Sequence, residues 1–215
     1  MIRSLKHLFV AGAKTGLFLP AVFGVVFAAR AATPQLPFWF EECASGAFQA
    51  SGPQARCVID ATGAALTLRN GDAAPATVRL QFAGANTAAS YHGEGAQSGL
   101  INHLIGNQTA QWQLNDTAFA RVSAENIYPG ISAVFYGNDR RLEYDLTVAP
   151  GARPEIIALH FDGADKISVD STGNLHLSVG GSEITQPAPV IYQLVNGSRQ
   201  AIHGGYVLRD QLETA

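Results

Sequence analysis

The feature that most constrains the fold is an eight-residue run, 141–148, in which apolar and polar side chains alternate. Leu142, Tyr144, Leu146 and Val148 fall on one face, and the residues between them are charged or polar. Successive side chains of a β-strand point to opposite faces of the sheet, so a period of two is typical of a strand with one buried face. The run therefore predicts a half-buried β-strand.

The segment in front of this run completes a hairpin. Residues 131–136 are β-branched and aromatic, and the turn-forming residues Gly137, Asn138 and Asp139 separate them from the next run. Such residues tolerate the positive φ of a tight turn. The sequence therefore predicts an antiparallel hairpin over 131–148.

Similar patterns recur along most of the chain. Further hairpins are predicted over 56–69, 167–179 and 190–208, and single strands over 78–82, 118–124 and 157–161. The glycine-rich segment 84–112 predicts instead a long irregular excursion with one short strand near 101–105. No segment of ten or more residues after position 31 shows a helical period. We therefore predict one domain, residues 32–215, folded as an all-β antiparallel β-sandwich of about ten short strands.

The first 31 residues have the order of a secretory signal peptide. Three cations precede an uncharged apolar run from Thr15 to Ala29, and small residues flank Arg30. The run has 15 residues, whereas a spanning helix needs roughly 20, so a membrane anchor is the weaker alternative. We expect cleavage after Ala31 and a chain that is secreted or held at the cell surface, with no stable membrane span.

Charge argues against a nucleic-acid partner. Removing residues 1–31 takes four of the 14 cations and none of the 17 acidic residues, so the net charge changes from −3 to −7. Binding to phosphates needs clustered lysine and arginine, and the remaining chain has one lysine and nine dispersed arginines. We expect no nucleic-acid binding.

Cys43 and Cys57 are the two cysteines of the chain. In an oxidising compartment such a pair can persist as a disulfide, which would stabilise the fold by about 3 kcal/mol. Two buried thiols are the alternative. Neither cysteine has the spacing of a zinc site or of a thioredoxin-like motif. We predict a Cys43–Cys57 disulfide.

A set of short phrases, in a constant order, resembles a bacterial domain of unknown function. They are FEE (40–42), LIGN (104–107), FARV (119–122), NIYPGI (126–131), FYGN (135–138), LEYDLTVAPGA (142–152), FDGAD (161–165) and PVIYQ (189–193). The resemblance covers residues 38–209. It implies an exported surface protein in which the domain precedes SBBP-type β-propeller repeats, and it implies no catalytic residues.

Two departures from that family matter. Both cysteines stand where the family usually has other residues, which supports a bridge between them. The family also continues beyond the strand that matches 206–208, so the chain resembles a truncated member. A missing last strand would leave one sheet edge unpaired, and we expect either self-association through this exposed edge strand or a lower stability than that of a longer chain.

Glu143 and Asp145 are the candidate catalytic residues. They project from one face of the predicted strand about 7 Å apart, a spacing that suits the paired carboxylates of an inverting glycosidase. A solvated strand face explains the same alternation without any chemistry. The sequence therefore favours a non-enzymatic structural or interaction module, which binds another extracellular protein or a glycan. The alternative is a carbohydrate-active or calcium-dependent enzyme fragment that uses Glu143 and Asp145.

Metal and cofactor signals are weak. Turn residues could supply oxygen ligands to calcium, but they lack the spacing of a known calcium loop; they are Asn138, Asp139, Asp162, Asp165 and Asp170. Aspartate in turns also bonds its own backbone and needs no metal. The histidines are dispersed, and the serine-hydrolase elbow and the phosphate-binding loop are missing from the sequence. We predict no cofactor.

Overall fold

The computed structural model describes eight parts of the chain, residues 6–11, 21–26, 28–29, 39–43, 45–69, 74–103, 113–138 and 141–210. Within these residues the regular elements are β-strands and one 3₁₀ turn, η2 (Pro154–Ile156). All strand pairs in the described part are antiparallel. The all-β antiparallel prediction is confirmed. No helix among the described residues is long and apolar enough to cross a membrane.

The strands have the following bounds: β1 Lys6–Ala11, β2 Ala21–Val26, β3 Ala28–Ala29, β4 Phe40–Glu42, β5 Phe48–Ser51, β6 Ala55–Asp60, β7 Gly63–Leu68, β8 Ala76–Phe82, β9 Tyr91–His103, β10 Gln113–Tyr128, β11 Ile131–Asn138, β12 Arg141–Val148, β13 Ala158–Asp162, β14 Lys166–Val169, β15 Leu175–Val179, β16 Ser182–Gln186, β17 Val190–Val195, β18 Ser198–Ala201 and β19 Gly205–Asp210.

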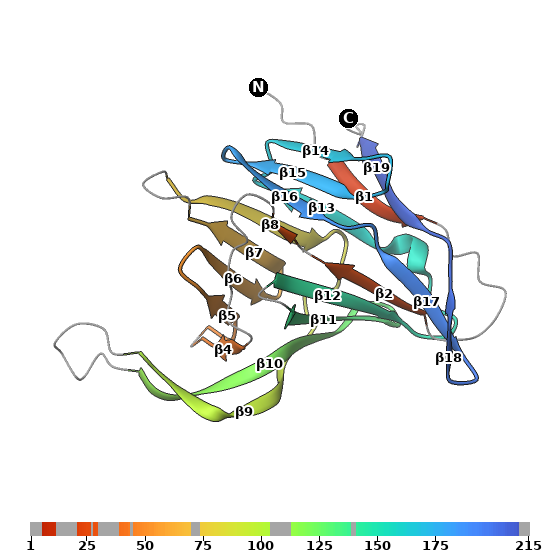
Figure 1. Cartoon of the computed structure of the whole chain (residues 1–215). Helices are drawn as coiled ribbons and strands as arrows, with labels where there is room; N and C mark the ends of the chain where they lie inside the picture. Colours follow the sequence, from red (N-terminus) through yellow and green to blue (C-terminus); the bar gives the residue numbers. More distant parts are fainter. Residues whose placement is uncertain are drawn as a thin grey trace.

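Among the described residues, most strands belong to one large sheet. Fourteen of its fifteen strands follow the order β18-β17-β2-β12-β11-β10-β4-β5-β6-β7-β8-β13-β1-β19, and the fifteenth, β9, pairs with β10. The sheet curls into a half-barrel, and a four-stranded sheet, β14-β15-β16-β3, lies beside its β13 and β19 side (Figure 1). The structure thus does not confirm the predicted sandwich. Curling follows from the twist that accumulates across so many neighbouring strands.

The hairpin predicted over 131–148 forms in the structure. β11 pairs with β12 from Ile131 opposite Val148 to Asn138 opposite Arg141. The four apolar residues of β12 are buried, which confirms the face that the alternation predicts. Glu143, on the other face, is also buried.

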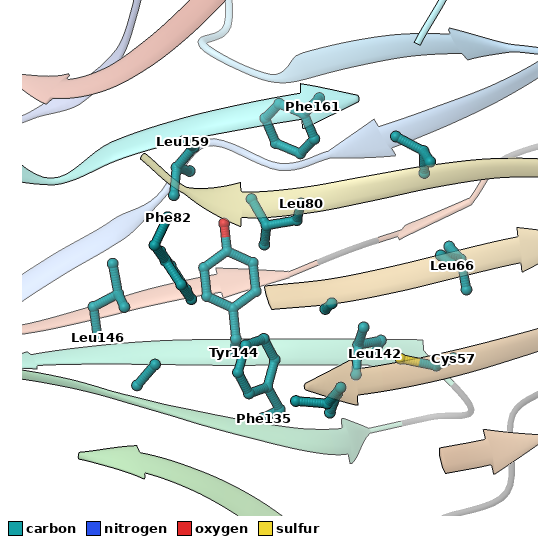
Figure 2. Packing of buried hydrophobic residues seen from close by; sticks show 14 of the residues in the cluster. Cys57, Leu66, Leu80, Phe82, Phe135, Leu142, Tyr144, Leu146, Leu159 and Phe161 are labelled. Atoms are coloured by element: carbon teal, nitrogen blue, oxygen red, sulfur yellow. The ribbon is translucent and has the colours of Figure 1, made fainter. Parts of the chain in front are cut away.

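The core is centred on aromatic side chains from three strands. The ring centroid of Tyr144 lies 6.3 Å from that of Phe82 and 5.8 Å from that of Phe135 (Figure 2). The Nε2 atom of Gln186, in the small sheet, donates hydrogen bonds to the hydroxyls of Tyr144 (3.1 Å) and Tyr206 (2.5 Å). The Gln186 side chain thus connects the two sheets through the core. Buried polar groups need hydrogen-bond partners, and Gln186 finds its partners on the large sheet.

One prediction was wrong in the middle of the chain. The segment expected to be irregular contains β9, which pairs with β10 in a long ribbon (Figure 1). Gly93 sits directly against the ring of Phe119, where an added Cβ would lie 2.4 Å from the ring's Cγ atom. The glycine there makes room for an aromatic ring on the sheet surface and does not mark a loop. The end of the predicted short strand, residues 104–105, lies outside the described residues.

The last predicted hairpin forms only in its first part. Asn196 and Gly197 both have positive φ, as a two-residue hairpin turn requires, and β17 pairs with β18. The second strand then ends at Ala201, and its continuation, β19, pairs with β1 instead. β16, which the sequence analysis did not predict, follows β15 through Gly180 and Gly181.

The backbone of the predicted leader forms strands. β1 lies between β13 and β19, β2 lies between β12 and β17, and β3 pairs with β16. This arrangement belongs to the uncleaved chain. The structure does not test cleavage after Ala31, which stays a prediction.

Candidate functional site

A pocket of about 540 Å³ opens where the β6–β7 turn meets the turn after β8. This volume falls in the range of sites that bind small ligands. We call it the Tyr91 pocket. Its lining residues are Ala61, Thr62, Gln81, Phe82, Ala83, Gly84, Ala85, Asn86, Thr87, Tyr91, Ile127 and His160.

The turn after β8 is held by backbone hydrogen bonds on both sides. The amide of Ala85 bonds the carbonyl of Phe82 (3.1 Å), and the amide of Asn86 bonds the carbonyl of Ile127 (2.8 Å). The Oδ1 atom of Asn86 accepts from the amide of Ala88 (3.0 Å), an Asx turn. Gly84 supplies the positive φ of this bend. The wall of the pocket is therefore fixed in advance of any ligand.

The hydroxyl of Tyr128 holds the same turn through a hydrogen bond. Its hydroxyl bonds the carbonyl of Ala83 at 2.8 Å and lies 3.2 Å from the carbonyl of Ala158. Burial raises the pKa of Tyr128 to about 12, so the hydroxyl remains a proton donor. The Tyr128 hydroxyl thereby links Ala83 in the pocket wall to Ala158 of β13.

The pocket combines an apolar floor with uncharged polar groups. Phe82 and Ile127 are buried, while Thr62, Gln81 and Tyr91 bring a hydroxyl, an amide and a phenol to the lining. Burial, together with the negative charge of Asp60, raises the pKa of Tyr91 to about 12. The Tyr91 hydroxyl is thus neutral at physiological pH. Apart from His160, the lining residues carry no ionisable side chain other than this phenol.

An ion pair supports the β6–β7 turn at the pocket. The Nη1 atom of Arg79 lies 3.0 Å and 3.1 Å from the two carboxylate oxygens of Asp60. The amide and hydroxyl of Thr62 also donate to Asp60. Burial alone would raise the pKa of Asp60, but the hydrogen bonds from Thr62 and Arg79 outweigh it and lower the pKa. The two opposite charges offset each other beside the pocket, which favours a neutral ligand.

Glu143 and Asp145 lie on the face of β12 opposite its four apolar residues, where Glu143 is buried and Asp145 is partly exposed. Neither residue lines the Tyr91 pocket. The Nδ2 atom of Asn138 donates to Glu143 (3.0 Å), and the hydroxyl of Tyr136 donates to Asp145 (3.2 Å). The structure places the two carboxylates on one strand face, as the sequence predicts, and gives each a donor from β11.

The electrostatics of this pair follow from its burial. Burial raises the pKa of Asp145, and the Tyr136 hydrogen bond and the positive charge of Arg199 only partly oppose it. Burial and the two nearby carboxylates also raise the pKa of Tyr136. A carboxyl with a raised pKa is one requirement of a general acid. A second requirement is a cleft that holds the substrate between both carboxyls, and neither carboxyl lines the Tyr91 pocket.

Cys43 and Cys57 are not joined in the structure, in contrast to the predicted disulfide. Cys57 lies in β6, and Cys43 follows β4, with β5 between the two strands. The two strand spacings alone come to about 10 Å, and the register adds an offset along the strands, whereas disulfides span Cα distances of roughly 4.4–6.8 Å. Cys57 belongs to the buried core cluster (Figure 2), and burial raises the pKa of its thiol to about 12.

Two of the turn residues considered for calcium accept hydrogen bonds, Asp170 within its own turn and Asp165 from the β15–β16 turn. Asp170 accepts hydrogen bonds from Thr172 and Asn174, and Asp165 accepts from the amide of Gly180. Asp139 lies outside the described residues. In the part of the chain that the structure covers, no three or more His, Cys, Asp or Glu side chains are grouped so as to hold a metal ion.

Sequence reasoning did not find the Tyr91 pocket. Its polar residues come from two turns, from β8, from the start of β9 and from one position of β13. Asn86 and Gly84 were included in an expected irregular excursion. The one local signal was the combination of Gly84, Asn86 and Thr87 directly after a strongly alternating strand, which predicts a tight turn at that strand's end.

Comparison with known proteins gives one match. A family model described as a domain of unknown function (DUF7948) matches residues 39–214. No curated protein and no solved structure matches the chain.

Proposed function

Because the chain belongs to the DUF7948 family, a domain family described without an assigned activity, we propose its function from the geometry: a non-enzymatic interaction module that binds a neutral glycan in the Tyr91 pocket. The observation that carries the proposal is the pocket itself. It is large enough for a sugar unit, fixed by backbone hydrogen bonds, and lined by neutral polar groups over an apolar floor.

These features match the chemistry of sugars. A sugar ring presents hydroxyls, which bond amides and hydroxyls, and a C–H face, which packs against aromatic and aliphatic groups. Thr62, Gln81 and Tyr91 can supply the polar contacts, and Phe82 and Ile127 the apolar surface. Since the Asp60–Arg79 pair is internally neutralised, an ionic ligand has little to gain here.

The setting that we propose is outside the cytoplasm. The leader-like order of residues 1–31 supports export, and the low lysine content with a net charge of −7 after its removal supports a partner other than nucleic acid. The phrases shared with exported surface proteins that carry SBBP-type repeats support a place at the cell surface. In that setting the domain would act as a structural or interaction module of a larger surface protein.

The binding proposal is tested by titrating the isotopically labelled chain with neutral oligosaccharides of several linkages and following backbone NMR signals. We expect the shifts to concentrate on residues 81–91 and on Ile127. Shifts concentrated on 143–145 would contradict the proposal, and shifts from a peptide but from no sugar would replace the glycan by a protein partner.

Replacing Tyr91 by alanine should weaken sugar binding at least about tenfold, as expected for an aromatic residue central to a contact. Tyr192→Ala is the matched control, because Tyr192 is also a partly exposed strand tyrosine but lies on β17 under Arg199. Equal affinities in the two variants would show that the pocket is not the site.

The enzymatic alternative is tested separately. Glu143→Gln and Asp145→Asn keep the shape of both side chains and remove their charge. We expect unchanged sugar binding and no change in any glycan turnover. A turnover that the wild type shows and that both variants lose, at unchanged melting temperature, would establish the alternative.

A further inference from the structure

The last strands of the chain are joined to the sheet by the predicted leader. In the described part of the sheet, β17 and its hairpin partner β18 reach β12 only through β2, and β19 reaches β13 only through β1. Residues 190–210 therefore depend on backbone hydrogen bonds to residues 6–11 and 21–26 (Figure 1).

The family match covers some of these strands and not the others. The match over 39–214 includes β17, β18 and β19 but leaves out β1, β2 and β3. The domain's own strands thus leave a gap one strand wide between β12 and β17. We call this gap the acceptor slot.

The slot has a defined register on both sides. β2 pairs antiparallel with β12 from residue 143 to 148 and with β17 from residue 190 to 193. Position 23 lies between Leu146 and Ile191, and position 24 between Asp145 and Val190. Since β2 is antiparallel to both neighbours, β12 and β17 run parallel to each other, two strand spacings or about 9–10 Å apart.

The chemistry of the slot selects an apolar strand. Leu146 is 0% exposed and Ile191 5% exposed while β2 is in place. An empty slot would uncover this row and leave two lines of backbone N–H and C=O groups without partners. An extended segment can cover the apolar row and pair with both lines of backbone groups if it has apolar residues at alternate positions and no proline in its middle.

We propose that the acceptor slot binds an apolar β-strand of a partner polypeptide after the leader has been removed. The structure already shows one occupant of that kind, AVFGVV at 21–26, seated in register between both walls. In the uncleaved chain the leader fills the slot, and cleavage after Ala31 makes it available at the site of export. Strand addition of this type gains affinity from main-chain hydrogen bonds and specificity from alternate side chains.

The test uses the full chain with a protease recognition sequence inserted between residues 31 and 38. After folding and cutting, we expect the N-terminal fragment to stay bound during gel filtration. Excess fluorescent peptide of residues 21–28, with two added lysines for solubility, should displace it. The same peptide with Phe23→Pro lacks one ladder N–H and should show no exchange.

Hydrogen exchange at the amides of 143–148 and 190–193 distinguishes the outcomes. Loss of protection when the fragment leaves, restored by the peptide, supports the proposal. Release of the fragment with protection unchanged would overturn it, because β12 and β17 would then close the slot themselves. A dimer formed on release would also overturn it, by making a second copy the occupant, as would failure of the peptide to restore protection.

Discussion

His176 couples the stability of this fold to pH. Its Nε2 atom lies 2.9 Å from the carboxylate of Asp170, and its Nδ1 atom lies 2.9 Å from that of Glu183. The hydrogen bond to Asp170, followed by that to Glu183, raises the pKa of His176. A histidine whose folded pKa exceeds its unfolded value of about 6.5 adds stability below that pH. The added stability is lost as the pH rises through the folded pKa.

We therefore expect His176→Gln to lower the melting temperature at about pH 5.5 and to have a smaller effect at about pH 8.5. Because the imidazole is partly solvated, the effect should also shrink at high salt. Thermal unfolding at both pH values measures it. His203→Gln, an exposed histidine on another segment, is the control. A loss of stability that grows with pH would contradict this assignment.

Cys57 gives a second prediction for a single residue. Its side chain is 0% exposed and its thiol pKa is raised to about 12, so it should react with a thiol reagent only when the protein unfolds. Cys43, which is partly exposed, should react in the native state. Mass spectrometry of labelled native and denatured protein measures both. A mass two hydrogens lower with no reactive thiol would restore the disulfide that the sequence suggested.

At the scale of elements, alternation was the reliable signal. The hairpins over 56–69 and 131–148, and strand β8, were predictable because β6, β8 and β11 alternate in burial and the strands end at turn residues such as Gly63. The first part of β9 was not predictable because its glycines are typical of loops, while the role of Gly93 depends on Phe119 of another strand. Side-chain packing across strands is decided in three dimensions and leaves little trace in local sequence.

Gly93 tests this explanation. Gly93→Ala would place a Cβ 2.4 Å from the Phe119 ring, so we expect a loss of about 1–3 kcal/mol in the free energy of unfolding, typical of overpacking. Gly205→Ala is the control, since nothing lies within 4 Å of its added Cβ. Chemical denaturation measures both variants. Equal stabilities would show that the β9–β10 ribbon does not depend on this contact.

At the scale of the whole molecule, the sequence predicted all-β antiparallel structure but neither the curled sheet nor the site. The Tyr91 pocket exists because the β6–β7 turn, the turn after β8 and β13 meet in space. Glu143 and Asp145 could be recognised in the sequence because both lie in the single strand β12 with a regular alternation. Sequence patterns report neighbours along a strand, whereas a pocket is made by neighbours across the sheet.

The N-terminal strands connect the fold to its proposed location. In the uncleaved chain they complete the sheet, and their removal opens the acceptor slot. The central claim is therefore that the domain works outside the cytoplasm without residues 1–31. Both the glycan proposal and the partner-strand proposal take their biological setting from this claim.

The most direct test is the intact mass of the protein recovered from a bacterial host that expresses the full chain. The account predicts an extracytoplasmic protein whose first residue is Ala32. A cytoplasmic protein that retains residues 1–31 would contradict it, and would make β1 and β2 permanent strands of the sheet.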